Sequence, residues 1–210
     1  MRTFTEQRGN YQITCYEVDV TPLMKKLALD FSVDLIDGDN QYNRLLPAEI
    51  NDAEIEARLR IQRTYMGKLA ELAFADFLIE RGIDFSTSGM FQIYEGQDSV
   101  DKYDFVKESG ERIDIKCGFR SIHKLLAINT QQFDSNSHKD YYVAVKLDAV
   151  DIDSDLKLVD LNSVTKAKIL GYAEYQYLLE SAPIRDLGEG PARIIKYARL
   201  LGIDRLLNDF

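Results

Sequence analysis

This chain has few cysteines and no long apolar run, and each of these features excludes certain classes of protein. The 210 residues include two cysteines, Cys15 and Cys117, and no CxxC pair. Neither a zinc site nor a disulfide framework is therefore indicated, and a reducing compartment fits. No apolar run approaches the ~20 residues that a membrane-spanning helix needs, and residues 1–12 are too polar for a signal peptide. We expect a cytoplasmic protein that does not associate with membranes.

Positive charge is also in the minority. The chain has 26 lysines and arginines against 35 aspartates and glutamates, which gives a formal net charge of −9. This balance disfavours a protein that coats nucleic acid non-specifically. An enzyme that concentrates positive charge in one cleft is still compatible with it. With 45% hydrophobic residues and no internal repeat, linker or low-complexity tract, residues 1–210 are expected to form a single domain.

Hydrophobic periodicity predicts alternating strands and helices, as in an α/β domain. We expect strands over residues 10–20, 140–147 and 168–172, short extended pieces over 83–85 and 91–94, and a hairpin or loop over 150–161. We expect helices over residues 23–31, 52–82, 175–179 and 192–207, with a break near 64–67 and an N-cap at Asn51. Residues 121–133 are ambiguous and favour a helix in part.

The helix over residues 52–82 carries one apolar stripe in its second half, at the spacing of a buried helix face. Its members are Met66, Leu69, Ala70, Ala73, Phe74, Phe77 and Leu78. Glu71 lies at the edge of this stripe. Its carboxylate is therefore placed to point toward a sheet rather than into water.

The stretch 103–120, YDFVKESGERIDIKCGFR, carries the pattern with the most chemical content. Tyr103–Lys107 and Arg112–Phe119 are expected to be the strands of a β-hairpin, joined by a turn at Glu108–Glu111. In the second strand Asp114 and Lys116 share one face, because successive side chains of a strand point to opposite faces. The other face is apolar and is expected to meet a core; it carries Ile113, Ile115 and Cys117.

Four charged side chains combine into a candidate hydrolytic site: Glu71, Asp104, Asp114 and Lys116. Phosphodiester hydrolysis requires a water activated near neutral pH and stabilisation of the charge that develops on phosphorus. A divalent cation held by carboxylates supplies both. Mg²⁺ prefers oxygen ligands and keeps several waters, so two or three carboxylates suffice. Lys116 could orient or deprotonate the attacking water, or neutralise the phosphate.

Each of these side chains also has an ordinary structural interpretation. Glu71 could pair with Lys68 on the helix surface, and Asp104 could be a turn residue beside a strand. Asp114 and Lys116 could form an exposed charge pair on an antiparallel sheet. A hydrolytic site requires all of them together, in the right order on the right elements.

This combination resembles the PD-(D/E)XK nuclease superfamily, which includes restriction endonucleases, Holliday-junction resolvases and repair nucleases. The resemblance rests on Glu71 in GKLAELAF, Asp104 in KYDF, and Asp114 and Lys116 in RIDIKC. It implies that Asp104 and Asp114 are ligands of Mg²⁺, with Mn²⁺ as a substitute. It further implies that Glu71 is an additional ligand, directly or through water, and that Lys116 is the catalytic lysine.

The resemblance covers residues 64–147 and includes the order helix, strand, strand, helix, strand. The chain departs from the superfamily's first motif at Tyr103, where proline is common. A second D-x-K triplet, Asp155 to Lys157, lies in an acidic stretch and lacks the upstream carboxylates. We expect this second triplet to be a hairpin turn.

Basic residues gather around the candidate site along the sequence. Arg120, His123 and Lys124 follow Lys116 and are candidate contacts to DNA phosphates; for His123 the alternative is an ordinary surface histidine. Other basic residues form either part of the same rim or ordinary helix-surface ion pairs. They are Arg58, Arg60, Arg63, Lys68, Arg193, Lys196 and Arg199.

We therefore expect an α/β protein with a restriction-endonuclease-like core, in which helices flank a central mixed β-sheet. The expected function is a Mg²⁺-dependent DNA endonuclease, with a type II restriction enzyme as the first choice. Such an enzyme would act as a homodimer, because two sites related by two-fold symmetry suit a palindromic target. The alternatives are a structure-selective nuclease, such as a junction resolvase or repair nuclease, and a non-catalytic protein of the same fold that binds nucleic acid or a protein partner.

Overall fold

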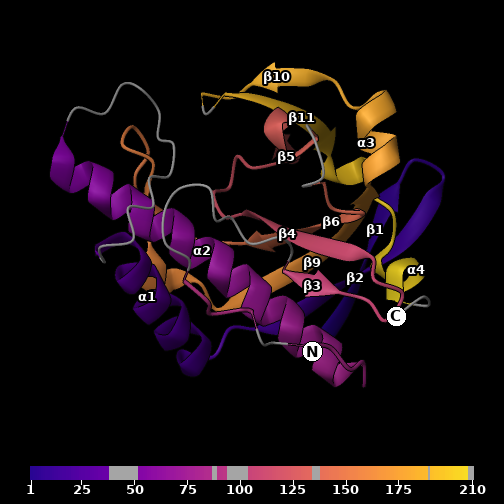
Figure 1. Ribbon diagram of the computed structural model, residues 1–210, viewed down its shortest axis with the longest axis horizontal. Helices are drawn as coiled ribbons and strands as arrows, with labels where there is room; N and C mark the ends of the chain where they lie inside the picture. The colour runs from indigo at the N-terminus through magenta and orange to yellow at the C-terminus, as the bar shows by residue number, and fades with distance from the viewer. Residues whose placement is uncertain (38–51, 87–88, 94–103, 134–137, 189, 208–210) are drawn as a thin grey trace.

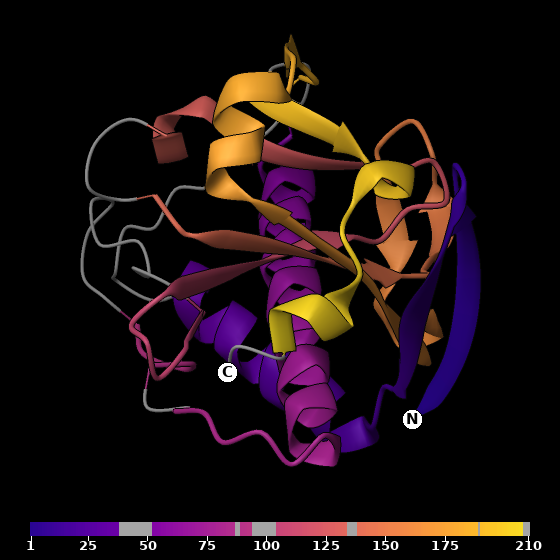
Figure 2. The same ribbon diagram turned by 90° about the vertical axis from the view of Figure 1, so that its right-hand side faces the viewer.

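A six-stranded mixed sheet forms the centre of the computed structural model (Figure 1), which describes residues 1–37, 52–86, 89–93, 104–133, 138–188 and 190–207. The strand order is β1-β2-β9-β6-β4-β3. The strands are β1 (Arg2–Arg8), β2 (Tyr11–Asp19), β3 (Phe105–Val106), β4 (Arg112–Gly118), β6 (Tyr141–Leu147) and β9 (Lys166–Glu174). All neighbours pair antiparallel except β4 and β6, which are parallel. The hairpin of β1 and β2 forms one edge of the sheet (Figure 2).

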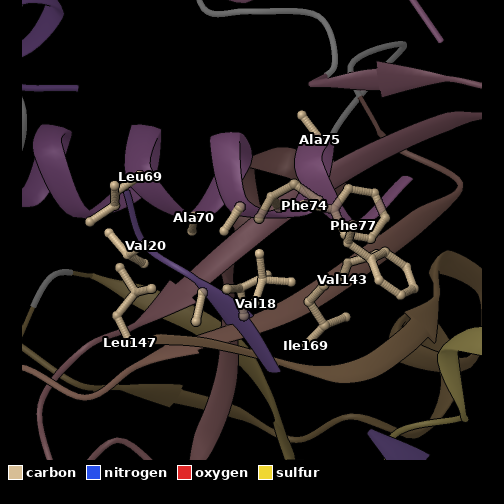
Figure 3. Close-up of a cluster of buried hydrophobic side chains, with 14 of the residues drawn as sticks. Val18, Val20, Leu69, Ala70, Phe74, Ala75, Phe77, Val143, Leu147 and Ile169 are labelled. Atoms are coloured by element: carbon tan, nitrogen blue, oxygen red, sulfur yellow. The ribbon is translucent and has the colours of Figure 1, made fainter. Parts of the chain in front are cut away.

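Helices cover one face of this sheet: α1 (Pro22–Asp37), α2 (Ala53–Glu80) and α4 (Ile203–Leu207). The N-cap of α2 is Asp52, whose carboxylate accepts hydrogen bonds from the amides of Glu54 and Ile55 at 2.9 and 3.1 Å. The predicted N-cap, Asn51, lies outside the described residues. The seven residues of the predicted apolar stripe are all fully buried. They pack against residues of the sheet such as Val18, Val143 and Ile169 (Figure 3).

The predicted break in α2 near residues 64–67 is wrong, because the helix runs unbroken from Ala53 to Glu80. Thr64, Tyr65 and Met66 are all buried at this point. Packing on more than one side of the helix therefore holds Gly67 in helical conformation, although glycine costs about 1 kcal/mol relative to alanine in a helix.

A smaller sheet and one helix cover the other face of the large sheet. The small sheet has the order β10-β11-β5, and its strands are β10 (Ile184–Asp186), β11 (Pro191–Lys196) and β5 (Leu125–Asn129). With α3 (Tyr175–Ser181) they close a second apolar cluster over Tyr142 and Ala144 of β6. The structure thus confirms an α/β protein with a mixed central sheet flanked by helices. No helix within the described ranges is both long enough and apolar enough to cross a membrane.

The predicted helix over residues 192–207 is wrong, and the helix expected in part of residues 121–133 is limited to a short 3₁₀ turn; in both segments a strand of the small sheet takes its place. Residues 192–207 form β11, a 3₁₀ turn (Tyr197–Arg199) and the short α4 instead of one helix. Residues 121–133 form β5 and a 3₁₀ turn (Thr130–Phe133). The two strands pair with each other, so that Arg193 lies opposite Ile128. This pairing joins segments far apart in the sequence, and it overrides their local helical spacing.

The connection between the parallel strands β4 and β6 also differs from expectation. The resemblance implied a helix between them, whereas the described part of this connection contains β5 and the 3₁₀ turn. A parallel pair needs a crossover of a dozen or more residues, which is usually a helix. Here a strand of the second sheet takes that place.

Most of the remaining predicted elements agree with the structure in kind. The expected hairpin over 150–161 contains β7 (Val150–Asp153) and β8 (Leu158–Asp160). Asp153 accepts hydrogen bonds from the amides of Asp155 and Leu156 at 3.0 and 2.9 Å, so the second D-x-K triplet belongs to a turn. The short extended pieces are not strands in their described parts, and Tyr103 lies outside the described residues.

Candidate active site

Strand β4 separates its side chains into an apolar set and a charged set, as predicted. Ile113 and Ile115 are buried in the core beneath α2. Asp114 and Lys116 lie on the opposite face, where the ammonium of Lys116 contacts Oδ2 of Asp114. Asp114 is 8% exposed and the side chain of Lys116 is 23% exposed. The pair is therefore largely removed from water, which rules out the interpretation as an exposed surface pair.

Asp104 is held opposite this pair by backbone hydrogen bonds. Its amide donates to the carbonyl of Ile113 at 3.0 Å, which continues the antiparallel register of β3 and β4 by one residue toward Asp114. Its Oδ2 accepts a hydrogen bond from the amide of Ile115 at 2.6 Å. The carboxyl group is thereby fixed to the backbone of the strand that carries Asp114 and Lys116.

Glu71 approaches from α2. Its Oε2 lies 2.5 Å from Nζ of Lys68, so the ordinary pairing considered for this carboxylate does occur. The pair is not a solvated one, because the two side chains are 3% and 15% exposed. Lys68 is further held by the carbonyl of Met90 at 2.5 Å and by the ring of Phe31, whose centroid lies 4.5 Å from Nζ.

The electrostatics of Asp104 show that the predicted residues share one neighbourhood. Burial is the largest cause that raises the pKa of this carboxyl group, and the negative charges of Glu71 and Asp114 raise it further. The amide of Ile115 and the ammonium of Lys116 act in the opposite direction. The fold thus brings together Glu71, Asp104, Asp114 and Lys116, which come from a helix and two strands.

Lys139 belongs to the same neighbourhood, and sequence reasoning missed it. It lies two residues before β6 and is 4% exposed. Burial lowers the pKa of its ammonium, which the charges of Asp114 and Asp104 partly offset. Its amide donates to the hydroxyl of Tyr142 at 3.4 Å, and Tyr142 stands beside Asp114 in the parallel register of β4 and β6. The parallel pairing of β4 with β6 brings Lys139 to this position, and no local pattern in the sequence indicates that pairing.

The donor set fits a Mg²⁺ ion that keeps most of its water. Oδ2 of Asp114 is buried and makes no hydrogen bond; its contact is the ion pair with Lys116. The repulsion among three carboxylates at Asp104 is the kind that a cation relieves. Within the described ranges, no three His, Cys, Asp or Glu side chains form a closed metal-binding group. Mg²⁺ needs only one or two protein carboxylates besides water.

The three candidate DNA contacts after β4 differ in their surroundings. Arg120 is 8% exposed and is held by Oδ1 of Asp151 at 3.0 Å and by the carbonyl of Ser154 at 3.2 Å. His123 accepts hydrogen bonds at Nδ1 from the amides of Phe119 and Arg120 at 3.1 and 3.3 Å. Burial and the neighbouring cations lower the pKa of His123 to about 4, so its ring is neutral. Lys124 is exposed.

Several members of the wider basic set serve the structure of the protein itself. Arg63 and Lys68 are buried. Arg193 donates to the carbonyls of Leu178 and Ala182, both at 3.2 Å, and lies over the ring of Phe133. Arg58, Lys196 and Arg199 are exposed. A contact between this set and DNA therefore remains a prediction that rests on its exposed members.

Comparison with protein-family models, with curated proteins and with solved structures found no match to this chain.

Proposed function

We propose that this protein is a metal-dependent DNA endonuclease with the active-site residues Glu71, Asp104, Asp114 and Lys116. The observation that carries the proposal is the largely buried Asp114–Lys116 pair on β4. It lies opposite the carboxyl group of Asp104, whose pKa is raised by burial and further by the charges of Glu71 and Asp114. Structural ion pairs are usually placed at the surface. Here three carboxylates interact with one another at a largely buried position, and Lys116 beside them is still open to solvent, which better suits a cation and a phosphate.

Asp104 and Asp114 are the residues that would hold Mg²⁺, or Mn²⁺ in its place, with Glu71 as a ligand directly or through water. The bound cation would supply an activated water and stabilisation of the charge that develops on phosphorus. The hydrogen bond from the amide of Ile115 orients the carboxyl group of Asp104 toward β4. The pairing of Glu71 with Lys68 fixes the third carboxylate on its helix.

Lys116 is the residue proposed to act on the reacting groups. Its ammonium stands at the carboxylate of Asp114, and its side chain keeps 23% of its surface exposed. It is thus both held in place and open to a substrate. In that position it can orient the attacking water or neutralise the phosphate. Lys139, which is 4% exposed, adds a further positive charge near Asp114 and Asp104.

A type II restriction endonuclease that works as a homodimer is the specific form of the proposal. A single chain of 210 residues offers one such site among its described residues, and cutting both strands of a duplex requires two. A pair of chains related by two-fold symmetry places two sites on a palindromic target.

The test is DNA cleavage by the purified full chain in Mg²⁺ and in Mn²⁺, with EDTA as the metal-free control. The substrates are a mixture of plasmids and a synthetic four-way junction. Asp114→Asn, purified identically, controls for a contaminating nuclease. Discrete plasmid fragments that disappear in EDTA and in the variant support a restriction enzyme. Cutting of the junction alone supports a structure-selective nuclease, and no cleavage of either substrate contradicts the enzymatic proposal.

A further inference from the structure

A surface cavity of about 550 Å³ lies where the loop after β4 meets the ends of β6, β9 and β11. Four lysines from four different segments line it: Lys124, Lys146, Lys168 and Lys196. Its volume falls within the roughly 300–1,000 Å³ that is usual for small-molecule sites. The proposed hydrolytic step does not use these lysines, although Lys124 and Lys196 are also candidate contacts to DNA.

The charge of the cavity is opposite to that of the whole chain. The four lysines stand against two carboxylates, Glu6 and Asp148, which leaves a formal excess of +2 in a chain of net charge −9. Nζ of Lys168 lies 2.5 Å from Oδ2 of Asp148, so this lysine is already matched. Lys146 is buried, and its ammonium donates to the carbonyl of Arg120. Lys124 and Lys196 are exposed at the rim.

The two rim lysines are held together although they lie far apart in the sequence. The register of β5 and β11 places Lys196 opposite Leu125, next to Lys124. The amide of Tyr197 donates to the carbonyl of Lys124 at 3.1 Å, so a backbone hydrogen bond joins the two segments directly beside both lysines. The backbone thus brings two lysines to the mouth of one cavity, and lysine ammonium groups are point charges that bind phosphate oxygens.

The rest of the lining consists of the aliphatic residues Leu125, Leu170 and Ala198 and the rings of Tyr197 and His123. The hydroxyl of Tyr197 packs against Gly118, where it occupies the space that a side chain would need. Gly118 lies two residues beyond Lys116 on the same face of β4. The cavity and the candidate active site therefore open from the same face of the large sheet.

We infer that this cavity binds a nucleotide through its phosphomonoester group. The excess of +2 matches a phosphate dianion, which would lie against Lys124, Lys146 and Lys196. The aliphatic side chains and rings of the lining suit the face of a base. The nucleotide is either a free one or the phosphorylated end of a strand, since both present the same group.

The test is calorimetric titration of the full chain in EDTA, so that no cleavage is involved. The probes are deoxyadenosine 5′-monophosphate, deoxyadenosine and inorganic phosphate. We expect saturable one-to-one binding of the nucleotide and affinities at least about tenfold lower for the other two, because each lacks one half of the interaction. The double variant Lys124→Gln/Lys196→Gln should weaken nucleotide binding by about tenfold or more, since it removes two charge-assisted contacts.

The matched control is Lys25→Gln/Lys26→Gln, which makes the same change of charge on α1. It should bind the nucleotide as the wild type does. Short oligonucleotides with a 5′-phosphate or a 5′-hydroxyl then separate the two sources. Binding that requires the 5′-phosphate identifies a strand end, and exclusion of both oligonucleotides identifies a free nucleotide. The inference is overturned if no phosphomonoester binds saturably, or if both double variants lose binding equally. Neither result depends on nuclease activity.

Discussion

At the scale of single residues, Asp104 shows how the proposed function conflicts with stability. Its carboxyl group is surrounded by protein and by two further carboxylates, so its ionised form is disfavoured in the folded chain. Because its pKa is raised, this cost is absent below about pH 4, the ordinary value for aspartate. The cost grows as the pH rises and is complete once the pH exceeds the raised value.

Replacement of Asp104 by asparagine should therefore stabilise the metal-free protein at neutral pH. If the relief is about 1 kcal/mol, the midpoint of thermal unfolding rises by about 2–4 °C for a chain of this size. The gain should vanish at about pH 3, where the wild-type carboxyl is protonated in both the folded and the unfolded state. Mg²⁺ should raise the midpoint of the wild type but not that of Asp104→Asn. A variant that is less stable than the wild type at both pH values contradicts the electrostatic interpretation.

Lys139 provides a second test at this scale, because its charge lies near Asp104 and Asp114. Lys139→Met removes a cation that favours the ionised carboxylates. The acidic limb of the pH–rate profile for DNA cleavage should therefore move to higher pH. The control is Lys146→Met, which removes another buried lysine of the same region, one whose ammonium donates to the carbonyl of Arg120. We expect no such shift in the control, and an unmoved profile in Lys139→Met would remove this residue from the site.

The residue scale also shows what the sequence could and could not predict. Alternation along β4 correctly separated Asp114 and Lys116 from Ile113 and Ile115, because the period of a strand is local information. The burial of Asp114 and the approach of Lys139 were not predictable in this way. Both depend on the parallel pairing of β4 with β6, which no local pattern encodes.

At the scale of elements, the small sheet is where sequence and structure diverge. The apolar residues of β11 include the neighbours Ile194 and Ile195, which are compatible with helical spacing as well as with a strand. The pairing of β11 with β5 and β10 decides between the two. By contrast, the sequence predicts that α2 is a helix, because its apolar residues recur at helical spacing over a long stretch. The structure buries every residue of that stripe.

The contact between Gly118 and Tyr197 joins β4 to the segment after β11, and it predicts a specific energetic coupling. Gly118→Ala should destabilise the protein by about 1–3 kcal/mol, as overpacking of a filled site does, because the hydroxyl of Tyr197 fills the space of the new methyl group. In a Tyr197→Phe background the same substitution should cost less. Urea unfolding of the four proteins measures the difference. An equal cost in both backgrounds would show that this contact does not position the cavity wall.

At the scale of the whole molecule, the distribution of charge makes a net charge of −9 compatible with the anionic substrate of the proposed function. Charge is not distributed uniformly, because the cavity gathers four lysines and the candidate site places Lys116 and Lys139 at its carboxylates. Both lie on the face of the large sheet that the small sheet partly covers. The large sheet thus packs one face against the main core, and its other face combines a second apolar cluster with the charged region that the proposed chemistry would use.

The central claim is that the hairpin of β3 and β4 carries the hydrolytic site, and a comparison of two lysine variants tests it most directly. Rates of Mg²⁺-dependent DNA cleavage are measured for the wild type, for Lys116→Ala and for Lys26→Ala, an exposed lysine paired with Asp30 on α1. We predict a loss of about 10²-fold or more for Lys116→Ala and an unchanged rate for Lys26→Ala, with both variants folded. A wild-type rate in Lys116→Ala would contradict the claim.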